Sequence, residues 1–180
     1  LDTDERRRFA QVSHEYLIEH VQDQTVTAGS NSELNFNHPV KELIFTVDAT
    51  DGQLGAIGSG SDTYQLKLNG HDRLAPRPSS YYRLVQPYQH HTKVPDGHIY
   101  NYSFSIKPEE HQPSGTLNFS RIDSSEMAYS IIGPPSAPTG KDGGMAGNNS
   151  LEVGLTLHVF ARNYNVLRVT SGMGGLAFAN

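Results

Sequence analysis

Residues 99–123 read Ile-Tyr-Asn-Tyr-Ser-Phe-Ser-Ile-Lys-Pro-Glu-Glu-His-Gln-Pro-Ser-Gly-Thr-Leu-Asn-Phe-Ser-Arg-Ile-Asp. Large apolar residues alternate with small polar ones over 99–106, which predicts a half-buried strand. The apolar face of that strand is expected to hold Tyr100, Tyr102, Phe104 and Ile106.

The connection at 107–115 is stiff and polar, because Pro108 and Pro113 remove backbone donors and Gly115 relaxes the backbone. The alternation then resumes over 116–122, which predicts a second strand. Two strands joined by a rigid corner are typical of a β-sandwich.

The rest of the chain gives the same kind of pattern. Further strands are predicted over 40–49, 64–68, 125–132, 151–159 and 164–170. Over 14–26 the helical and strand patterns compete, and the family resemblance given below favours a strand at 15–26. Turns are expected at Asn69-Gly70 and at Arg162-Asn163, loops over 50–62 and 133–150, and an irregular tail over 172–175. The fold class is therefore all-β, an antiparallel sandwich of eight strands, a number that matches a jelly roll.

Helix is a minority element in this prediction. Asp2 is the expected N-cap of a short helix ending near Gln11, with Glu5 at the capping-box position. A second short helical piece is placed within 79–91. The expected organisation is a helical linker segment over 1–14 and a single jelly-roll domain over 15–180.

The composition of the chain excludes some kinds of site and disfavours some binding partners. The 180 residues include no cysteine, so a disulfide framework and a thiolate metal site are both excluded. The formal net charge is -5, and the only basic run is Arg6-Arg7-Arg8 beside acidic residues. Direct contact with nucleic acid is therefore not expected, because phosphate neutralisation needs clustered cations.

Five segments of the chain are informative together: Pro-Glu-Glu-His-Gln-Pro-Ser-Gly-Thr-Leu-Asn-Phe-Ser-Arg-Ile-Asp at 108–123 and the segments 5–11, 68–73, 160–168 and 171–175. In the same order along the chain, they resemble the major capsid proteins of large icosahedral double-stranded DNA viruses such as chloroviruses and iridoviruses. The resemblance implies a structural protein of the virion with no enzymatic activity and no cofactor. Since members of that family carry two jelly rolls and this chain has room for one, the chain is expected to be the C-terminal half.

The resemblance also implies the partners. Three copies would form a homotrimeric capsomer with a pseudo-hexagonal outline, in contact with neighbouring capsomers and minor capsid proteins in an icosahedral shell. Two other functional classes share the jelly-roll fold. A carbohydrate-binding jelly-roll module would need an aromatic platform or a carboxylate cluster for calcium, and a cupin-like metalloenzyme would need a His pair two residues apart, which the sequence lacks.

Candidate functional residues fall into three sets. Arg and Tyr residues in the irregular segment 71–92 are candidates for a subunit interface, because these types are enriched at interface centres: Arg73, Arg77, Tyr81, Tyr82, Arg83 and Tyr88. Polar residues within the family-like segments are candidates for pinning strand ends, with direct contact across the trimer as the alternative: Arg121, Asp123, Arg162 and Asn163. Among three Asn-x-Ser sequons, at Asn101, Asn118 and Asn148, only Asn148 lies in a predicted exposed loop and is the glycosylation candidate.

Two further clusters of residues contain the residue types of a catalytic or metal-binding site. The run Glu109-Glu110-His111 has the residue types of an acid–base set, but it lies on a Pro-bounded corner, so a structural or interface role is expected. His90 and His91 are adjacent and would point in opposite directions in a strand, which disfavours a shared metal.

Overall fold

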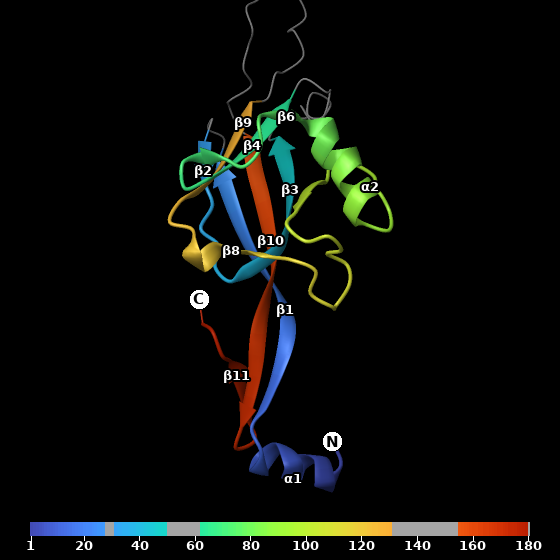
Figure 1. Cartoon of the computed structure of the whole chain (residues 1–180), viewed down its shortest axis with the longest axis vertical. Coiled ribbons are helices and arrows are strands. Elements are labelled where there is room, and N and C mark those ends of the chain that lie inside the picture. Colours follow the sequence, from blue (N-terminus) through green and yellow to red (C-terminus); the bar gives the residue numbers. More distant parts are fainter. Residues whose placement is uncertain (28–30, 50–61, 131–154, 180) are drawn as a thin grey trace, which may run out of the picture.

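The computed structural model describes residues 1–27, 31–49, 62–130 and 155–179 as two antiparallel sheets with short helical pieces (Figure 1). The larger sheet has the order β1-β10-β3-β7, with β11 paired to β10 and β8 paired to β3. Its strands are β1 (His14–Thr27), β3 (Pro39–Ala49), β7 (Tyr100–Ser103), β8 (Leu117–Asn118), β10 (Leu155–Thr170) and β11 (Met173–Leu176).

The smaller sheet has the order β2-β9-β4-β5, with β6 paired to β4. Its strands are β2 (Asn31–Glu33), β4 (Thr63–Leu68), β5 (His71–Asp72), β6 (Arg77–Pro78) and β9 (Ser125–Ser130). Two helical pieces, the π-helix η2 (Tyr81–Val85) and α2 (Gln86–His90), follow one another directly, and a 3-10 turn, η3 (Phe119–Arg121), follows β8. Among the described residues, no helix is long and apolar enough to cross a membrane.

An aromatic cluster fills the space between the two sheets. Phe45 on β3 lies 5.2 Å from the ring of Tyr64, 5.6 Å from that of Tyr82 and 5.5 Å from that of Tyr100, measured between ring centroids. Tyr82 of η2 donates a hydrogen bond to the Tyr64 carbonyl at 3.0 Å. Burial raises the pKa of both Tyr64 and Tyr82, so these hydroxyls stay neutral. The helical piece η2 therefore contributes the Tyr82 side chain to the core between the sheets.

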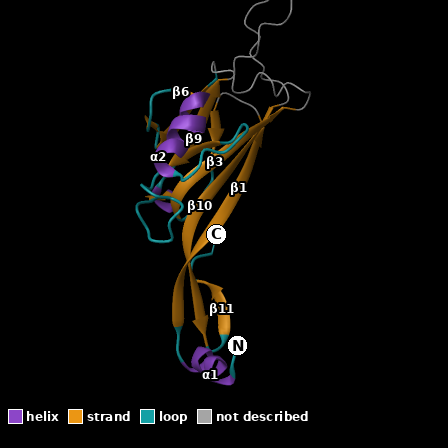
Figure 2. Cartoon of the chain, turned by 90° about the vertical axis from the view of Figure 1, so that its right-hand side faces the viewer, coloured by secondary structure: helices purple, strands orange, loops and turns teal. Residues whose placement is uncertain are grey.

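β1 and β10 continue well beyond the sandwich (Figures 1 and 2). Asn163 is the last residue of β10 that pairs with β3. The pairing of β10 with β1 continues beyond it, as far as Val169 opposite His14. β11 returns along β10 after a turn in which Ser171 and Gly172 both have positive φ, 54° and 77°. We call residues 14–21 of β1, 164–170 of β10, β11 and α1 (Thr3–Gln11) the arm.

α1 lies at the end of the arm (Figure 2). Asp2 is its N-cap, and the capping box with Glu5 is formed, as the sequence predicts. The Phe9 carbonyl accepts a hydrogen bond from the Gly172 amide at 3.0 Å, which attaches the helix to the β10–β11 turn. The division into a linker at 1–14 and a domain at 15–180 stays a prediction.

Some predicted elements need correction. The tight turn expected at Arg162-Asn163 is wrong, because β10 runs unbroken through both residues and only its register against β3 shifts there. The tail expected to be irregular at 172–175 contains β11. The described residues hold eleven strands rather than eight, because several pairings are only two or three residues long.

Residues 99–123 form shorter strands than the alternation of their side chains predicts. β7 ends at Ser103, because the amides of the next two residues both bind the Lys41 carbonyl of β3. Ile106, which was expected on the apolar face, is exposed. β8 has only two residues before η3 begins, yet Phe119 still points into the core. Residues 50–61 of the loop predicted at 50–62, the whole loop predicted at 133–150 and the first residues of the strand predicted at 151–159 lie outside the described residues.

Candidate functional site

A β-bulge on the larger sheet builds the most concentrated polar site. Arg162 pairs with Glu42 and Asn163 pairs with Val40, so Lys41 has no partner on β10. An extra residue in one strand changes the direction in which neighbouring side chains point. Lys41 and Glu42, adjacent in sequence, consequently join one charged network, and both are almost fully buried.

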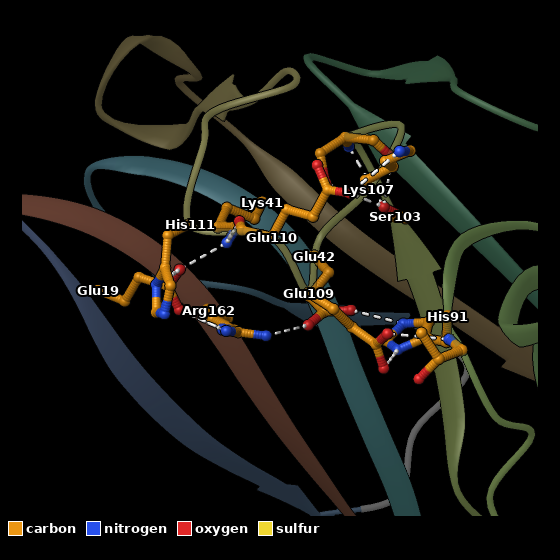
Figure 3. A network of polar contacts seen from close by, with 12 residues as sticks. Glu19, Lys41, Glu42, His91, Ser103, Lys107, Glu109, Glu110, His111 and Arg162 are labelled. Carbon is orange, nitrogen blue, oxygen red and sulfur yellow. Dashed lines mark hydrogen bonds and ion pairs between the residues drawn. The ribbon is translucent and has the colours of Figure 1, made fainter.

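Lys41 is the centre of this network (Figure 3). Its ammonium lies 2.7 Å from Glu19 Oε1 and donates to the Glu110 carbonyl at 3.1 Å. The same Nζ lies 5.0 Å from the centroid of the Tyr164 ring, a cation–π contact. The Lys41 carbonyl accepts the amides of Phe104 and Ser105 at 2.8 and 3.2 Å. One bulged residue thus holds the start and the middle of the segment 104–115 that follows β7, which we call the corner.

Arg162 and two glutamates complete the sheet side of the network. Arg162 Nε donates to Glu19 Oε2 at 2.8 Å, its Nη2 contacts the same oxygen, and its Nη1 lies 3.3 Å from Glu42 Oε1. Burial alone would raise the pKa of Glu19, but hydrogen bonds from Lys41 and Arg162 outweigh it and lower that pKa. Glu19 is therefore ionised at neutral pH.

His91, just after α2, connects the network to the corner. Its Nε2 lies 2.9 Å from Glu42 Oε2, and its Nδ1 lies 3.3 Å from Glu109 Oε1. The second oxygen of Glu109 accepts the Thr92 amide at 2.9 Å. The Glu42 carboxylate close to Nε2 raises the pKa of His91, and burial offsets this only partly.

The corner itself is closed by its own residues. Ser114 Oγ accepts the Lys107 amide at 2.9 Å and donates to the Lys107 carbonyl at 3.2 Å. Gly115 has φ 136°, and a Cβ there would lie 3.1 Å from the Phe104 carbonyl oxygen, so glycine is required. The corner is thus a preformed loop attached to the sheet by the charged network.

The predicted strand-pinning residues fall into two groups. Arg162 is in the network, and Asn163 is fully buried and donates to the Asn37 carbonyl at 3.2 Å. Arg121 and Asp123 are exposed. The Asp123 backbone amide donates to Asn69 Oδ1 at 2.9 Å, so the turn at Asn69-Gly70, rather than the Asp123 carboxylate, fixes this segment.

The predicted interface residues are likewise divided. Tyr82 belongs to the core. Tyr81 is half-buried, with the Arg77 guanidinium 5.6 Å from its ring centroid and its hydroxyl bound by Gln86 Nε2 at 2.8 Å. Arg73 and Arg77 are exposed, Arg83 is half-buried, and Tyr88 is 82% exposed.

Glu109, Glu110 and His111 do not meet as one set. Glu109 binds His91 and Thr92, the Glu110 carboxylate lies 3.0 Å from Lys107 Nζ, and His111 lies 3.7 Å from Glu19. His90 and His91 diverge, since His90 Nδ1 contacts the Ile106 carbonyl at 2.9 Å. Within the described ranges, no group of three or more His, Asp or Glu side chains is arranged to hold a metal ion.

The sequons are placed differently from one another. Asn101 is buried in β7, and Asn118 caps η3 by accepting the Ser120 amide at 3.1 Å. Asn148 lies outside the described residues.

The sequence did not indicate Lys41, Glu42 or Glu19 as site residues, and it drew attention to His91 only as a disfavoured metal ligand. A signal for the first two was present, because Val40-Lys41-Glu42-Leu43 places two adjacent charges inside an apolar strand pattern. Such an interruption indicates a bulge.

Comparison with known proteins assigns the chain to a family. The family model described as "Large eukaryotic DNA virus major capsid protein" matches residues 5–56 and 58–175. The chain belongs to this major capsid protein family.

Two relatives within the family illustrate the match. The major capsid protein of Pyramimonas orientalis virus is 47% identical over 204 residues, covering 100% of this chain and 47% of that protein. The major capsid protein of Paramecium bursaria Chlorella virus 1 is 38% identical over 228 residues, covering 100% of this chain and 52% of that protein. The chain thus spans about half the length of these capsid proteins.

Solved capsid structures have the same fold. PBCV-1 VP54, fitted into a reconstruction of the virophage Sputnik, superposes with a TM-score of 0.77 at 36% identity, covering 100% of this chain and 55% of that one. The quasi-atomic model of the PBCV-1 capsid gives a TM-score of 0.74, also at 36% identity and covering the same shares of the two chains. The predicted all-β jelly-roll class is confirmed, and so is the resemblance stated from the sequence.

Proposed function

We propose that the chain is one jelly roll of a major capsid protein and that its function is structural, as part of the icosahedral shell of a virion. The observation that carries this proposal is the family match along nearly the whole chain. The carbohydrate-binding alternative is not retained, because that match is to capsid proteins.

The site described above supports a structural role. The charges of Glu19, Lys41 and Arg162 are used against one another, and His91 is held between two carboxylates. Charged groups that are paired with one another in this way stiffen the attachment of the corner and α2 to the larger sheet. A rigid attachment suits a protein that presents fixed surfaces to its neighbours.

The finer assembly is also a proposal: homotrimers of complete copies with a pseudo-hexagonal outline, contacting neighbouring capsomers and minor capsid proteins, without direct contact to nucleic acid. Closed cyclic symmetry lets a single patch type serve all three copies. Whether this roll is the C-terminal one stays a prediction.

A surface over η2 and α2 is our candidate for the contact between copies. It consists of Leu84, Val85 and Tyr88, which are 50%, 40% and 82% exposed, with Arg73 just after β5 and Arg77 on β6 in the adjoining segment. We call these three apolar residues the α2 patch. A largely exposed tyrosine beside aliphatic side chains and arginines has the composition of an interface centre.

Native mass spectrometry and light scattering of the 180-residue chain test the assembly. We expect trimers at micromolar concentration, and Tyr88→Ser should weaken them by about 30-fold, the effect of losing one hot-spot residue. Tyr16→Ser is the matched control, since Tyr16 is also an exposed tyrosine but lies on the arm.

Three results are distinguishable in this experiment. A trimer weakened only by Tyr88→Ser supports the α2 patch, and a trimer weakened only by Tyr16→Ser moves the contact to the arm. A chain that stays monomeric at all accessible concentrations contradicts the proposal that this roll carries the trimer contact.

A further inference from the structure

His91 stands between two carboxylates that come from different parts of the chain. Nε2 faces Glu42 of β3 at 2.9 Å, and Nδ1 faces Glu109 of the corner at 3.3 Å. A neutral imidazole has one donor and one acceptor nitrogen, so it would place a lone pair against one of the two carboxylates. Only the protonated ring carries an N–H on both nitrogens and is attracted to both carboxylates.

Other polar contacts also link the three elements joined here: His90 Nδ1 lies 2.9 Å from the Ile106 carbonyl oxygen, and Lys41 binds the corner from β3 (Figure 3). The Glu42 side chain is only 1% exposed and is otherwise paired with Arg162 Nη1 at 3.3 Å. Glu109 is otherwise held by the Thr92 amide. Without the proton on His91, Glu42 keeps one cation, and the corner keeps its attachment through Lys41.

We propose that His91 is a proton-dependent latch that fastens the corner at 104–115 and the end of α2 to the larger sheet. The charged groups that face it are Glu42 and Glu109 directly and Arg162 through Glu42. Behind these, Lys41 and Glu19 carry opposite charges that are already paired with each other. The latch is a regulatory contact and does not depend on the capsid role.

The direction of the pH effect follows from proton linkage. The Glu42 carboxylate beside the ring raises the pKa of His91 above its ordinary value, with burial opposing it. The hydrogen bond from the Thr92 amide lowers the pKa of Glu109, so that carboxylate stays charged as His91 titrates. The stabilisation by His91 is therefore complete below about pH 6.5, the unfolded value, and is lost as pH rises through the higher folded pKa.

Two measurements on the wild-type chain test this latch. The first is the NMR titration of the His91 ring, which we expect to give a pKa above about 6.5. The second is hydrogen exchange at the amides of Thr92 and Phe104, which bind Glu109 and Lys41. Their protection factors should fall as the ring loses its proton, by up to about tenfold per pH unit between the two pKa values.

His91→Gln should abolish this fall, because glutamine does not titrate. The matched control is His71→Gln, since His71 is exposed on β5 of the smaller sheet, and that variant should keep the wild-type pH dependence. If His91→Gln does not fold, the two wild-type measurements still decide. A ring pKa at or below about 6.5, or protection factors that do not change over the window, would overturn the proposal.

Discussion

The sandwich and the arm are stabilised in different ways, although β1 and β10 run through both. In the sandwich the larger sheet is covered on its inner face by the smaller one, and residues such as Leu43, Phe45 and Leu157 have no exposed surface. In the arm there is no second sheet (Figure 2). Tyr16, Leu17 and Leu176 are about half exposed there.

This difference shows which forces maintain each part. The sandwich is stabilised by burying apolar surface, at about 25 cal/mol per Å². The arm depends on backbone pairing, with β1, β10 and β11 side by side. A half-open pocket of about 330 Å³ lies where the arm leaves the sandwich, and its lining includes Leu17, Val166 and Phe178.

The charged network lies at the junction of the two parts. Asn163 is the last residue of β10 that pairs with β3, and the bulge at Lys41 is immediately beside it. Glu19 on β1 and Arg162 on β10 meet Lys41 at this point. The network therefore secures the place where β1 and β10 lose the cover of the sandwich.

The largest expected effect is in the sandwich core. Phe45→Ala should lower the free energy of unfolding by about 4 kcal/mol, because it removes a ring that contacts three tyrosines. Phe160→Ala on the neighbouring strand is the control; its ring is 38% exposed, and we expect a loss of under about 1 kcal/mol. Urea unfolding followed by circular dichroism measures both. Equal losses would contradict the view that the core, rather than the sheet as a whole, stabilises the sandwich.

The next effect is at the junction. Lys41→Met keeps the length of the side chain but removes its charge, and it should cost about 3 kcal/mol because Glu19 and the Glu110 carbonyl lose a buried partner. Lys107→Met removes an exposed pair with Glu110, so we expect at most about 0.5 kcal/mol. The same unfolding assay compares them. A cost for Lys41→Met no greater than that for Lys107→Met would show that the network contributes little to stability.

Much of the sandwich could be predicted from alternation and turn residues. The strands at 40–49 and 64–68 were placed within a few residues, because each has a regular apolar face. The pattern alone left 14–26 open between helix and strand, and the family resemblance favoured the strand that β1 forms. The unbroken β10 was missed because Arg162-Asn163 looks polar enough to be a turn. In the fold, Arg162 finds counter-charges across two strands, a long-range contact that no local pattern contains.

The candidate site was harder to predict for the same reason. Glu19, Lys41, Glu42, Glu109 and Arg162 come from four separate segments, and only the bulge brings them together. The family resemblance marked the right stretches, including the corner and Arg162. It did not indicate which of their side chains meet.

Acid should weaken the junction through Glu19. Its pKa is lowered in the folded state, so its stabilisation is present above about pH 4.3, the unfolded value, and is lost as pH falls through the folded pKa. Glu19→Gln should cost about 2 kcal/mol at pH 7 and flatten the acid limb of the stability profile. Glu15→Gln breaks an exposed pair with Arg168 and should leave that limb unchanged. Melting temperatures between pH 2 and 7 measure the effect, and an unchanged acid limb in Glu19→Gln would contradict it.

The smallest effect is expected in the arm, and it tests the comparison most directly. Leu17 is 56% exposed, so Leu17→Ser should change the free energy of unfolding by no more than about 0.5 kcal/mol, whereas Leu43→Ser in the sandwich should cost several times as much. Urea unfolding at low protein concentration measures the isolated chain. If Leu17→Ser instead costs nearly as much as Leu43→Ser, Leu17 is covered in solution. Repeating the measurement at higher protein concentration then shows whether another copy covers it, because only association makes the unfolding midpoint depend on concentration.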